Sequence, residues 1–475
     1  MLIQQFVIKK LISFNIKVNT MSFSTINPAT EEIIKHYDEL SIEEVNLKIE
    51  KAHNAHLSWK EVPFSNRAEL MFNAAKVLRE KKEEYAELMA IEMGKPYVQG
   101  ISEAEKCAWV CDYYAENAEK QLADEVIATE MSRSYVTFQP IGAVLAIMPW
   151  NFPFWQVFRF AAPALMAGNA GILKHARNTM GCAIEIENVF KLAGFPEGLF
   201  TNLVIGSAIV DKVIENPLIA AVTLTGSTPV GKMVASKAGS LIKKTVLELG
   251  GSDPYVILED ADIDKAVATC VTARLINSGQ SCIAAKRFIV IQSRLEEFEN
   301  KYKAIMSTHI MGNPLDKTVT VGPQARKDLQ LDLDRQVRKS VEMGARILYG
   351  GVIPDGKGYF YPPTILTDVK KGMPAYDEEL FGPVAAIISA KDEEEAISIA
   401  NDTTFGLGAA VFTENIEKGN KIAREKLIAG ACFVNAFVKS DPRLPFGGVK
   451  ESGYGRELSA FGIKEFVNIK TVCVS

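Results

Sequence analysis

Two hydrophobic periodicities divide the chain. In the N-terminal third, apolar residues recur at three- and four-residue spacing, which predicts amphipathic helices. The first helix follows the capping-box sequence Ser41-Ile-Glu-Glu44. Its apolar face is formed by Val45, Ile49, Ala52, His56 and Trp59. Similar patterns predict helices over about 65–90 and 100–120.

Beyond residue 140, short and continuously apolar runs alternate with helical segments. The runs are 143–148, 171–173, 220–224 and 256–258, then 288–291, 385–388, 408–412 and 432–435. Helical segments near 155–167, 181–194 and 230–240 lie between the first of these runs. Apolar strands alternating with helices predict parallel sheets covered on both faces. We therefore expect an α/β fold with two such domains.

Composition excludes several classes of partner. The net charge is −5, and basic residues are spread along the 475-residue chain, which argues against nucleic acid or membrane as the main partner. The seven cysteines form no regular framework, so a reducing, cytoplasmic location is expected. Cys107 and Cys111 have no histidine partner nearby, and no zinc-ligand spacing occurs, so we expect no metal site.

The first twenty residues differ from the rest of the chain. They are rich in Ile, Lys and Asn, and lysines interrupt their apolar runs, so they predict neither a membrane span nor a clear signal peptide. We expect residues 1–20 to be a leader or extension ahead of Met21.

Three residues have the chemistry needed at a carbonyl group. Cys282 follows Gly279-Gln-Ser and precedes small residues, which leaves room for a substrate. Glu248 ends an apolar strand before Gly250-Gly251, where a raised pKa would suit a general base. Asn151, between Trp150 and Phe152-Pro153, is an amide donor for an oxyanion. Taken singly, each also has a structural interpretation: a core cysteine, a solvated carboxylate and a turn asparagine.

Together these segments resemble the aldehyde dehydrogenase superfamily from about residue 24 to the C-terminus. The resemblance implies a Rossmann-like dinucleotide-binding domain (21–120 and 141–250) and an α/β catalytic domain (251–455). It also implies a small β oligomerisation arm (121–140 and 456–475), to which the alternating segments 134–139 and 466–473 belong, and hence a homodimer or homotetramer. Cys282 would be the nucleophile, Glu248 the base and Asn151 the oxyanion donor.

The segment Thr225-Gly-Ser-Thr-Pro-Val-Gly-Lys-Met follows a strand and opens a helix. Its G-x-x-x-x-G-K pattern is not a P-loop, because Met233 cannot coordinate magnesium. In the family, this turn places Gly226 and Ser227 at the pyrophosphate of a nicotinamide dinucleotide. The resemblance adds Lys174 at the adenosine ribose, Glu379 at the nicotinamide ribose and Phe381 beside the nicotinamide. Trp150 and Leu249 complete the expected cofactor site.

Arg177 bears on the choice between NAD and NADP. Relatives that strongly prefer NAD often carry a glutamate here, and its absence removes repulsion toward a 2′-phosphate. We expect NADP to be accepted and slightly favoured over NAD, with a solvent-facing arginine as the alternative.

The finer resemblance is to succinate-semialdehyde dehydrogenases of the shorter bacterial type. It implies that Arg159 and Ser440 bind the distal carboxylate of the substrate and that Trp155 forms the pocket wall. Ile276 occupies a position where some of these enzymes have a second arginine, so glutarate semialdehyde or uncharged aldehydes remain alternative substrates. A cysteine esterase and a non-catalytic structural protein are remote alternatives from other classes.

Overall fold

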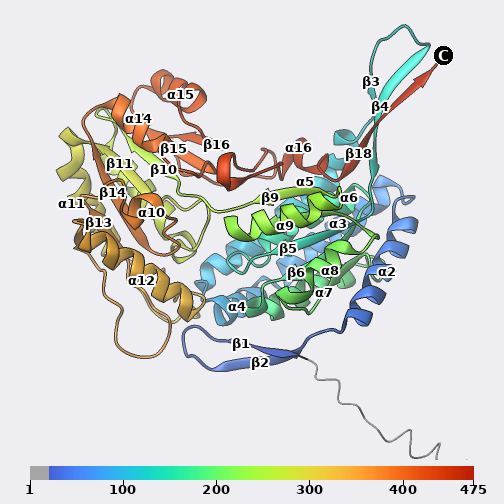
Figure 1. Cartoon of the computed structure of the whole chain (residues 1–475), viewed down its shortest axis with the longest axis horizontal. Helices are drawn as coiled ribbons and strands as arrows, with labels where there is room; N and C mark the ends of the chain where they lie inside the picture. The colour runs from blue at the N-terminus through green and yellow to red at the C-terminus, as the bar shows by residue number, and fades with distance from the viewer. Residues whose placement is uncertain (1–20) are drawn as a thin grey trace, which may run out of the picture.

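Two large sheets organise the chain in the computed structural model, which describes residues 21–475 (Figure 1). The expected leader, 1–20, lies outside the described residues. Each sheet is mainly parallel and has one short antiparallel strand at an edge. The predicted α/β class is confirmed.

The first sheet has the strand order β17-β9-β8-β5-β6-β7. Its strands are β5 (Ala143–Met148), β6 (Ala170–His175), β7 (Phe200–Asn202), β8 (Ile219–Thr225), β9 (Lys244–Glu248) and β17 (Gly453–Tyr454). The connecting helices are α6 (Trp155–Met166), α7 (Met180–Leu192), α8 (Val210–Glu215) and α9 (Thr228–Ser240). The N-terminal helices α2 (Ile42–Trp59), α3 (Phe64–Glu80), α4 (Lys82–Met93) and α5 (Tyr97–Gln121) lie in the same lobe (Figure 1).

Helix α2 forms as its sequence predicts. The Ser41 hydroxyl accepts a hydrogen bond from the Glu44 N–H, and the Glu44 carboxylate accepts one from the Ser41 N–H. These reciprocal bonds satisfy donors that the first turn leaves free. The five residues of the expected apolar face are the buried residues of the helix. The predicted cap and buried face are both confirmed.

The second sheet has the order β12-β13-β14-β11-β10-β15-β16. Its strands are β10 (Pro254–Ile257), β11 (Arg287–Ile291), β12 (Arg346–Tyr349), β13 (Thr364–Thr367), β14 (Val384–Ala390), β15 (Gly408–Phe412) and β16 (Ala431–Val434). Its main helices are α10 (Ile263–Leu275), α11 (Leu295–Met306), α12 (Lys327–Glu342), α14 (Glu393–Asn401) and α15 (Ile416–Glu425). Separate apolar clusters cover the two faces of this sheet, which explains its continuously apolar strands.

A third sheet projects from the first lobe (Figure 1). It contains β3 (Glu125–Val126), β4 (Arg133–Pro140) and β18 (Val467–Val474), and β4 pairs antiparallel with β18 along eight residues. The chain also returns to the first sheet through β17, which pairs with β9 although it lies in the range assigned to the catalytic domain. This return places the segment after residue 446 beside Glu248.

A two-stranded ribbon was not predicted. It consists of β1 (Ser22–Ile26) and β2 (Ile33–Asp38), and its residues are mostly exposed or half-buried, so they show no buried alternating face. Its tip contacts the second lobe: the Tyr359 N–H donates to Pro28 O at 2.8 Å and the Gly358 N–H donates to Glu31 Oε1 at 2.8 Å. The ribbon therefore connects the two lobes along one edge.

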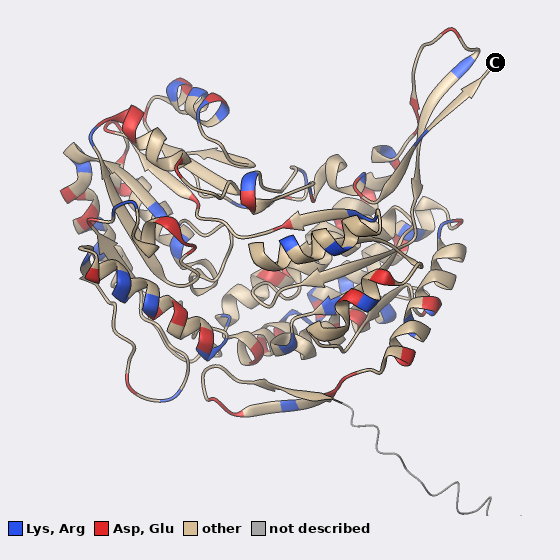
Figure 2. Cartoon of the chain, viewed as in Figure 1, with Lys and Arg blue, Asp and Glu red and all other residues tan. Residues whose placement is uncertain are grey.

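Figure 2 shows acidic and basic residues interspersed over both lobes, for example along α12. Among residues 21–475, the search for a helix able to cross a bilayer found none. No cluster of three or more potential metal ligands occurs in the same part of the chain.

Candidate active site

A cavity of about 310 Å³ lies at the carboxyl ends of the strands of the first sheet. It brings together residues predicted separately from the sequence: Trp150, Asn151, Gly226, Ser227, Leu249, Cys282, Glu379 and Phe381. The strand order explains the location. The chain runs from β5 outward to β6 and β7 on one side, then continues with β8 and β9 on the other, and ligands bind at such a switch point in α/β sheets.

The loop that carries Cys282 has an unusual backbone. Asn277, Ser278 and Gly279 have φ values of 52°, 56° and 76° in succession. A Cβ at Gly279 would lie 2.1 Å from Gly382 O, so this position requires glycine. The buried Arg274 donates to Gly279 O at 2.7 Å and fixes the turn that presents the thiol.

Amide side chains connect this loop to Asn151. Asn277 Nδ2 donates to Asn151 O at 2.7 Å and to Gln280 O at 3.0 Å. Asn151 Nδ2 donates to Gln280 O at 3.1 Å, two residues before Cys282. The predicted oxyanion donor is therefore held beside the predicted nucleophile by buried hydrogen bonds.

A buried ion pair supports the other side of Asn151. Lys95 Nζ lies 2.5 Å from Glu103 Oε2 and donates to Asn151 O at 2.9 Å. Glu103 Oε1 accepts the backbone N–H groups of Phe154 and Trp155, both at 2.9 Å, at the start of α6. These are donors that a helix N-terminus leaves free, and Glu103 is a favourable anion there. Lys95 and Glu103 were not predicted as site residues, because their partners in this network become visible only in the tertiary structure.

The Cys282 thiol is held in its neutral form. Burial raises its pKa to about 12, although the positive charges of Lys286 and Arg159 oppose that rise. Lys286 Nζ donates to Cys282 O at 2.6 Å and lies 3.3 Å from Glu379 Oε1. Lys286 was not predicted as a site residue, yet it joins the nucleophile loop to a predicted cofactor residue.

The Glu248 carboxylate is buried, and neither of its oxygens has a hydrogen-bond partner among the described residues. Burial and the nearby Glu457 raise its pKa well above the usual range, against the attraction of Arg159 and Arg456. A Cβ at Gly447 would lie 2.7 Å from Glu248 Oε1, so that glycine leaves space for the carboxylate. A buried carboxylate with a raised pKa has the property expected of a general base.

The turn after β8 has the geometry expected of an anion site. Ser227 caps α9 with an extended backbone but without a side-chain cap bond, and it lines the cavity together with Thr225 and Gly226. Glu379 Oε1 accepts the Gly251 N–H at 3.0 Å, which orients the carboxylate. Trp150 and Phe381 pack edge to face with ring centroids 5.7 Å apart.

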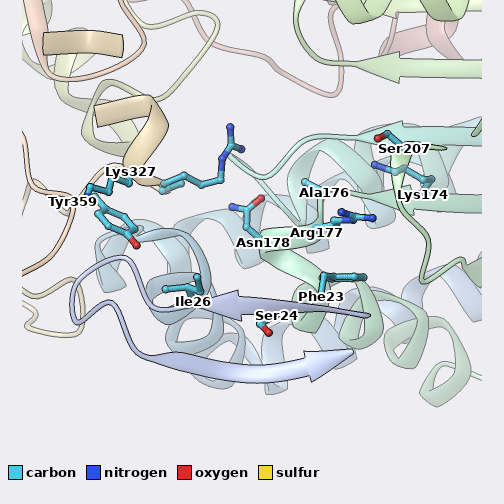
Figure 3. Close-up of a pocket in the computed structure, with 12 residues that line it drawn as sticks. Phe23, Ser24, Ile26, Lys174, Ala176, Arg177, Asn178, Ser207, Lys327 and Tyr359 are labelled. Carbon is cyan, nitrogen blue, oxygen red and sulfur yellow. The ribbon is translucent and has the colours of Figure 1, made fainter. Parts of the chain in front are cut away.

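A larger cavity of about 550 Å³ continues from this region (Figure 3). Its lining includes the basic residues Lys174, Arg177, Arg326 and Lys327 and no acidic residue. Arg177 is half exposed, pairs with Glu39 and lies 5.2 Å from the Phe23 ring centroid. Ser207 and Arg326 were not predicted, because they lie in segments far from Lys174 in the sequence. Arg326 lines both cavities, so the two are adjacent.

Arg159 and Ser440, the residues predicted to bind the substrate carboxylate, have different neighbours in the structure. Arg159 is buried, pairs with Glu457 and stacks on Phe446, with 4.7 Å between the guanidinium carbon and the ring centroid. It lines neither the Cys282 cavity nor the cavity that contains Trp155. Ser440 is buried and accepts a hydrogen bond from Lys106 Nζ at 2.8 Å. Their role in binding a substrate carboxylate stays a prediction.

Comparison with known proteins identifies the family to which the chain is similar. The sequence profile described as "Aldehyde dehydrogenase family" matches residues 16–472. The chain is 50% identical over 455 residues to a probable NADP-dependent succinate-semialdehyde dehydrogenase of Synechocystis, covering 96% of this chain and 100% of that protein. It is 46% identical over 458 residues to succinate-semialdehyde dehydrogenase [NADP(+)] 1 of Mycobacterium tuberculosis, with 96% and 100% coverage.

A solved structure agrees with these sequence matches. The crystal structure of succinic semialdehyde dehydrogenase from Streptococcus pyogenes, in complex with NADP+, superposes with a TM-score of 0.93 at 37% identity. The match covers 95% of this chain and 99% of that one. The similarity therefore extends over both lobes.

The Glu103 network makes a prediction about stability. The substitution Glu103→Ala would leave the buried Lys95 ammonium without a counter-ion and two α6 N–H groups without an acceptor, which should lower the free energy of unfolding by about 3–5 kcal/mol. Urea denaturation would measure it. Glu105→Ala, on the same helix but half exposed and paired with Lys82, is the control and should cost no more than about 1 kcal/mol. Equal losses in the two variants would contradict the prediction.

Proposed function

Since the chain belongs to the aldehyde dehydrogenase family, we propose that it oxidises succinate semialdehyde to succinate with a nicotinamide dinucleotide, NADP in preference to NAD. The observation that carries this proposal is that eight predicted site residues, Cys282 and Asn151 among them, line one cavity. The names of the Synechocystis and Mycobacterium relatives support the substrate and the cofactor.

In the proposed mechanism, Glu248 accepts the thiol proton of Cys282 and releases it to solvent. Cys282 Sγ bonds to the aldehyde carbon as the C=O π bond breaks and its electron pair moves to oxygen. Asn151 Nδ2 and the Cys282 N–H donate to the resulting oxyanion. A dinucleotide held by Gly226, Ser227, Glu379 and Phe381 would supply the hydride acceptor, and the thiohemiacetal carbon of Cys282 would thereby become a thioester. Water then adds to the thioester carbon while Glu248 accepts a proton, and Sγ leaves as the acid is released.

Glu248 must move to perform this step. Its carboxylate lies beside Gly447 and Glu457, and Glu248 does not line the cavity that contains Cys282, although its neighbour Leu249 does. Rotation of the side chain would bring it toward the thioester. The absence of hydrogen-bond partners for its oxygens makes this rotation inexpensive, because no bond has to be broken.

The two adjoining cavities fit an extended dinucleotide that carries several phosphate charges. The free N–H groups at the start of α9 and the basic lining around Lys174 favour phosphate. We place the adenosine 2′-phosphate of NADP near Arg177 and Ser207, with Lys174 at the ribose. The guanidinium of Arg177 is already oriented by Glu39, whose carboxylate does not line the cavity.

We also infer that the arm formed by β3, β4 and β18 contacts a second copy of the chain. Val126 and Ile469 expose 70% and 61% of their surface on this projecting sheet. Apolar side chains on an unpaired sheet edge are typical of a surface that another chain covers.

The proposed function is tested by initial rates of absorbance increase at 340 nm. Succinate semialdehyde and the uncharged butyraldehyde would each be supplied with NADP and with NAD. We expect the acidic aldehyde with NADP to give the highest kcat/KM and Cys282→Ala to give no turnover. Comparable rates on both aldehydes would contradict the substrate assignment and leave a general aldehyde dehydrogenase. Turnover of esters alone, independent of cofactor, would indicate a hydrolase.

The base assignment predicts a burst. Glu248→Gln should release about one equivalent of reduced cofactor rapidly and then turn over about 10²- to 10⁴-fold more slowly, because thioester hydrolysis lacks its base. Stopped-flow absorbance would measure both phases. In the wild type, steady-state turnover should rise with pH, since burial raises the pKa of Glu248 and only its ionised form accepts a proton. Steady-state rates equal to those of the wild type in Glu248→Gln would contradict the assignment.

The cofactor assignment predicts a change in the NADP/NAD ratio. Arg177→Gln removes a charge-assisted contact worth about 1.5–3 kcal/mol, so kcat/KM for NADP should fall roughly 10- to 100-fold relative to NAD. Because both cofactors are measured on the same variant, a general loss of folded protein cancels from the ratio. An unchanged NADP/NAD ratio would indicate that Arg177 pairs with Glu39 and does not contact the 2′-phosphate.

A further inference from the structure

Lys286 lies behind the loop that carries Cys282. Its backbone is fixed directly before β11, where its N–H donates to Asp253 O at 3.1 Å and its carbonyl accepts the Ala386 N–H at 3.0 Å. Its side chain is fully buried and does not line the Cys282 cavity. Lys286 therefore does not reach a ligand in that cavity, and its influence on the reaction must act through the groups that its ammonium contacts.

The ammonium of Lys286 has three acceptors, which match its three N–H donors. It donates to Ser281 O at 2.9 Å and to Cys282 O at 2.6 Å, the carbonyls of two successive residues. The third acceptor is Glu379 Oε1, at 3.3 Å. A buried cation is costly unless its donors are used. Two of the three donors hold the backbone on the two sides of the nucleophile.

The hydrogen bond to Ser281 O sets the direction of the Cys282 N–H. This carbonyl and this N–H belong to one peptide unit, which is planar and trans, so the N–H points opposite to the carbonyl. Since the carbonyl faces Lys286, the N–H points away from the ammonium. Cys282 lines the cavity and Lys286 does not. Within residues 21–475 this N–H has no hydrogen-bond acceptor, so it is free to donate to a ligand.

The charge of Lys286 also acts on the thiol. Burial raises the pKa of Cys282 to about 12, and among the positive charges that oppose this rise Lys286 has the largest effect, ahead of Arg159. Glu379 and Asp253 add to the rise. Burial lowers the pKa of Lys286 as well, against the attraction of these two carboxylates. The ammonium stabilises the thiolate relative to the thiol.

We infer that Lys286 is a positioning residue, which directs the Cys282 N–H to the carbonyl oxygen of the aldehyde and stabilises the anion that forms there. This inference rests on the proposed function, in which Sγ bonds to the carbonyl carbon and the π electron pair moves to the oxygen. The ammonium polarises the peptide through the Ser281 carbonyl, which strengthens the N–H as a donor. The same charge favours the thiolate before the attack. Asn151 supplies the second donor to the oxyanion.

The first measurement compares Lys286→Met with the wild type in a single turnover. Reduction of NADP by succinate semialdehyde, followed by stopped-flow absorbance, should slow roughly 10- to 100-fold, up to the cost of one lost oxyanion donor. KM for the aldehyde should change less than about threefold, because an interaction made only in the transition state affects kcat. The affinity for NADP, measured by fluorescence titration, should be retained.

The second measurement needs no cofactor. Alkylation of Cys282 by iodoacetamide, followed by mass spectrometry of the peptide that contains it, should slow roughly 3- to 10-fold in Lys286→Met at fixed pH, because the thiolate is the reacting form. A loop that had merely loosened would expose the thiol and alkylate faster. Lys286→Gln retains an amide donor but no charge. It should keep part of the single-turnover rate and alkylate as slowly as Lys286→Met.

Lys243→Met is the matched control. Lys243, directly before β9, is half-buried, and its ammonium also donates to two carbonyls, Ile214 O and Asn216 O, both at 2.6 Å. It lines neither the Cys282 cavity nor the adjoining basic cavity. This variant loses the same kind of contact and should keep both wild-type rates.

The outcomes separate this inference from the proposed function. Unchanged or faster alkylation in Lys286→Met, or a loss confined to the affinity for NADP, would overturn the inference and leave the proposed function intact. The second result would assign Lys286 to its pair with Glu379 alone. A wild type that oxidises other aldehydes in place of succinate semialdehyde would overturn the proposed substrate, while slower single turnover and slower alkylation in Lys286→Met would still support the inference.

Discussion

The buried Glu103 carboxylate is the interaction on which the arrangement of the site depends. It accepts two N–H groups at the start of α6 and pairs with Lys95, which donates to Asn151 O. Burying two charges is expensive, and the geometry offsets it because almost every polar atom of the pair has a partner. The same carbonyl of Asn151 accepts Asn277 Nδ2 from the nucleophile loop. One network therefore fixes the predicted oxyanion donor, the nucleophile loop and the cavity lined by Glu103 and Phe152 relative to one another.

Low polarity around the reacting groups determines their protonation. Burial raises the pKa of both Cys282 and Glu248, which favours the thiol and carboxyl forms over two anions. A neutral pair avoids repulsion with Glu457 and Glu379, which lie close by. The positive charge of Lys286, bonded to the carbonyl of Cys282, favours the thiolate when the proton is removed. Reactivity thus depends on where a proton can go, which is the task that the mechanism gives to Glu248.

The two cavities differ in the number of basic residues that line them. Basic residues from both lobes surround the long cavity that fits a dinucleotide, and they come from β6, its following loop and the start of α12 (Figure 3). The lining of the smaller cavity on the α5 side includes one lysine, Lys106, and one carboxylate, Glu103. The distribution of lysine and arginine therefore distinguishes the two binding regions by charge as well as by shape.

The sequence by itself determined the α/β class, the capped helix α2 and most of the strands, which follow from hydrophobic period and end signals. Eight residues of the Cys282 cavity were predicted through the resemblance of short motifs to a known family. It did not determine the β1–β2 ribbon, whose strands have little buried surface, or the return of β17 to the first sheet. Nor did it show which carboxylate Arg159 meets, because that depends on segments far apart in the sequence. Glu457, about 300 residues beyond Arg159, pairs with it, and only the tertiary structure decides that, since ion pairing is set by distance in space.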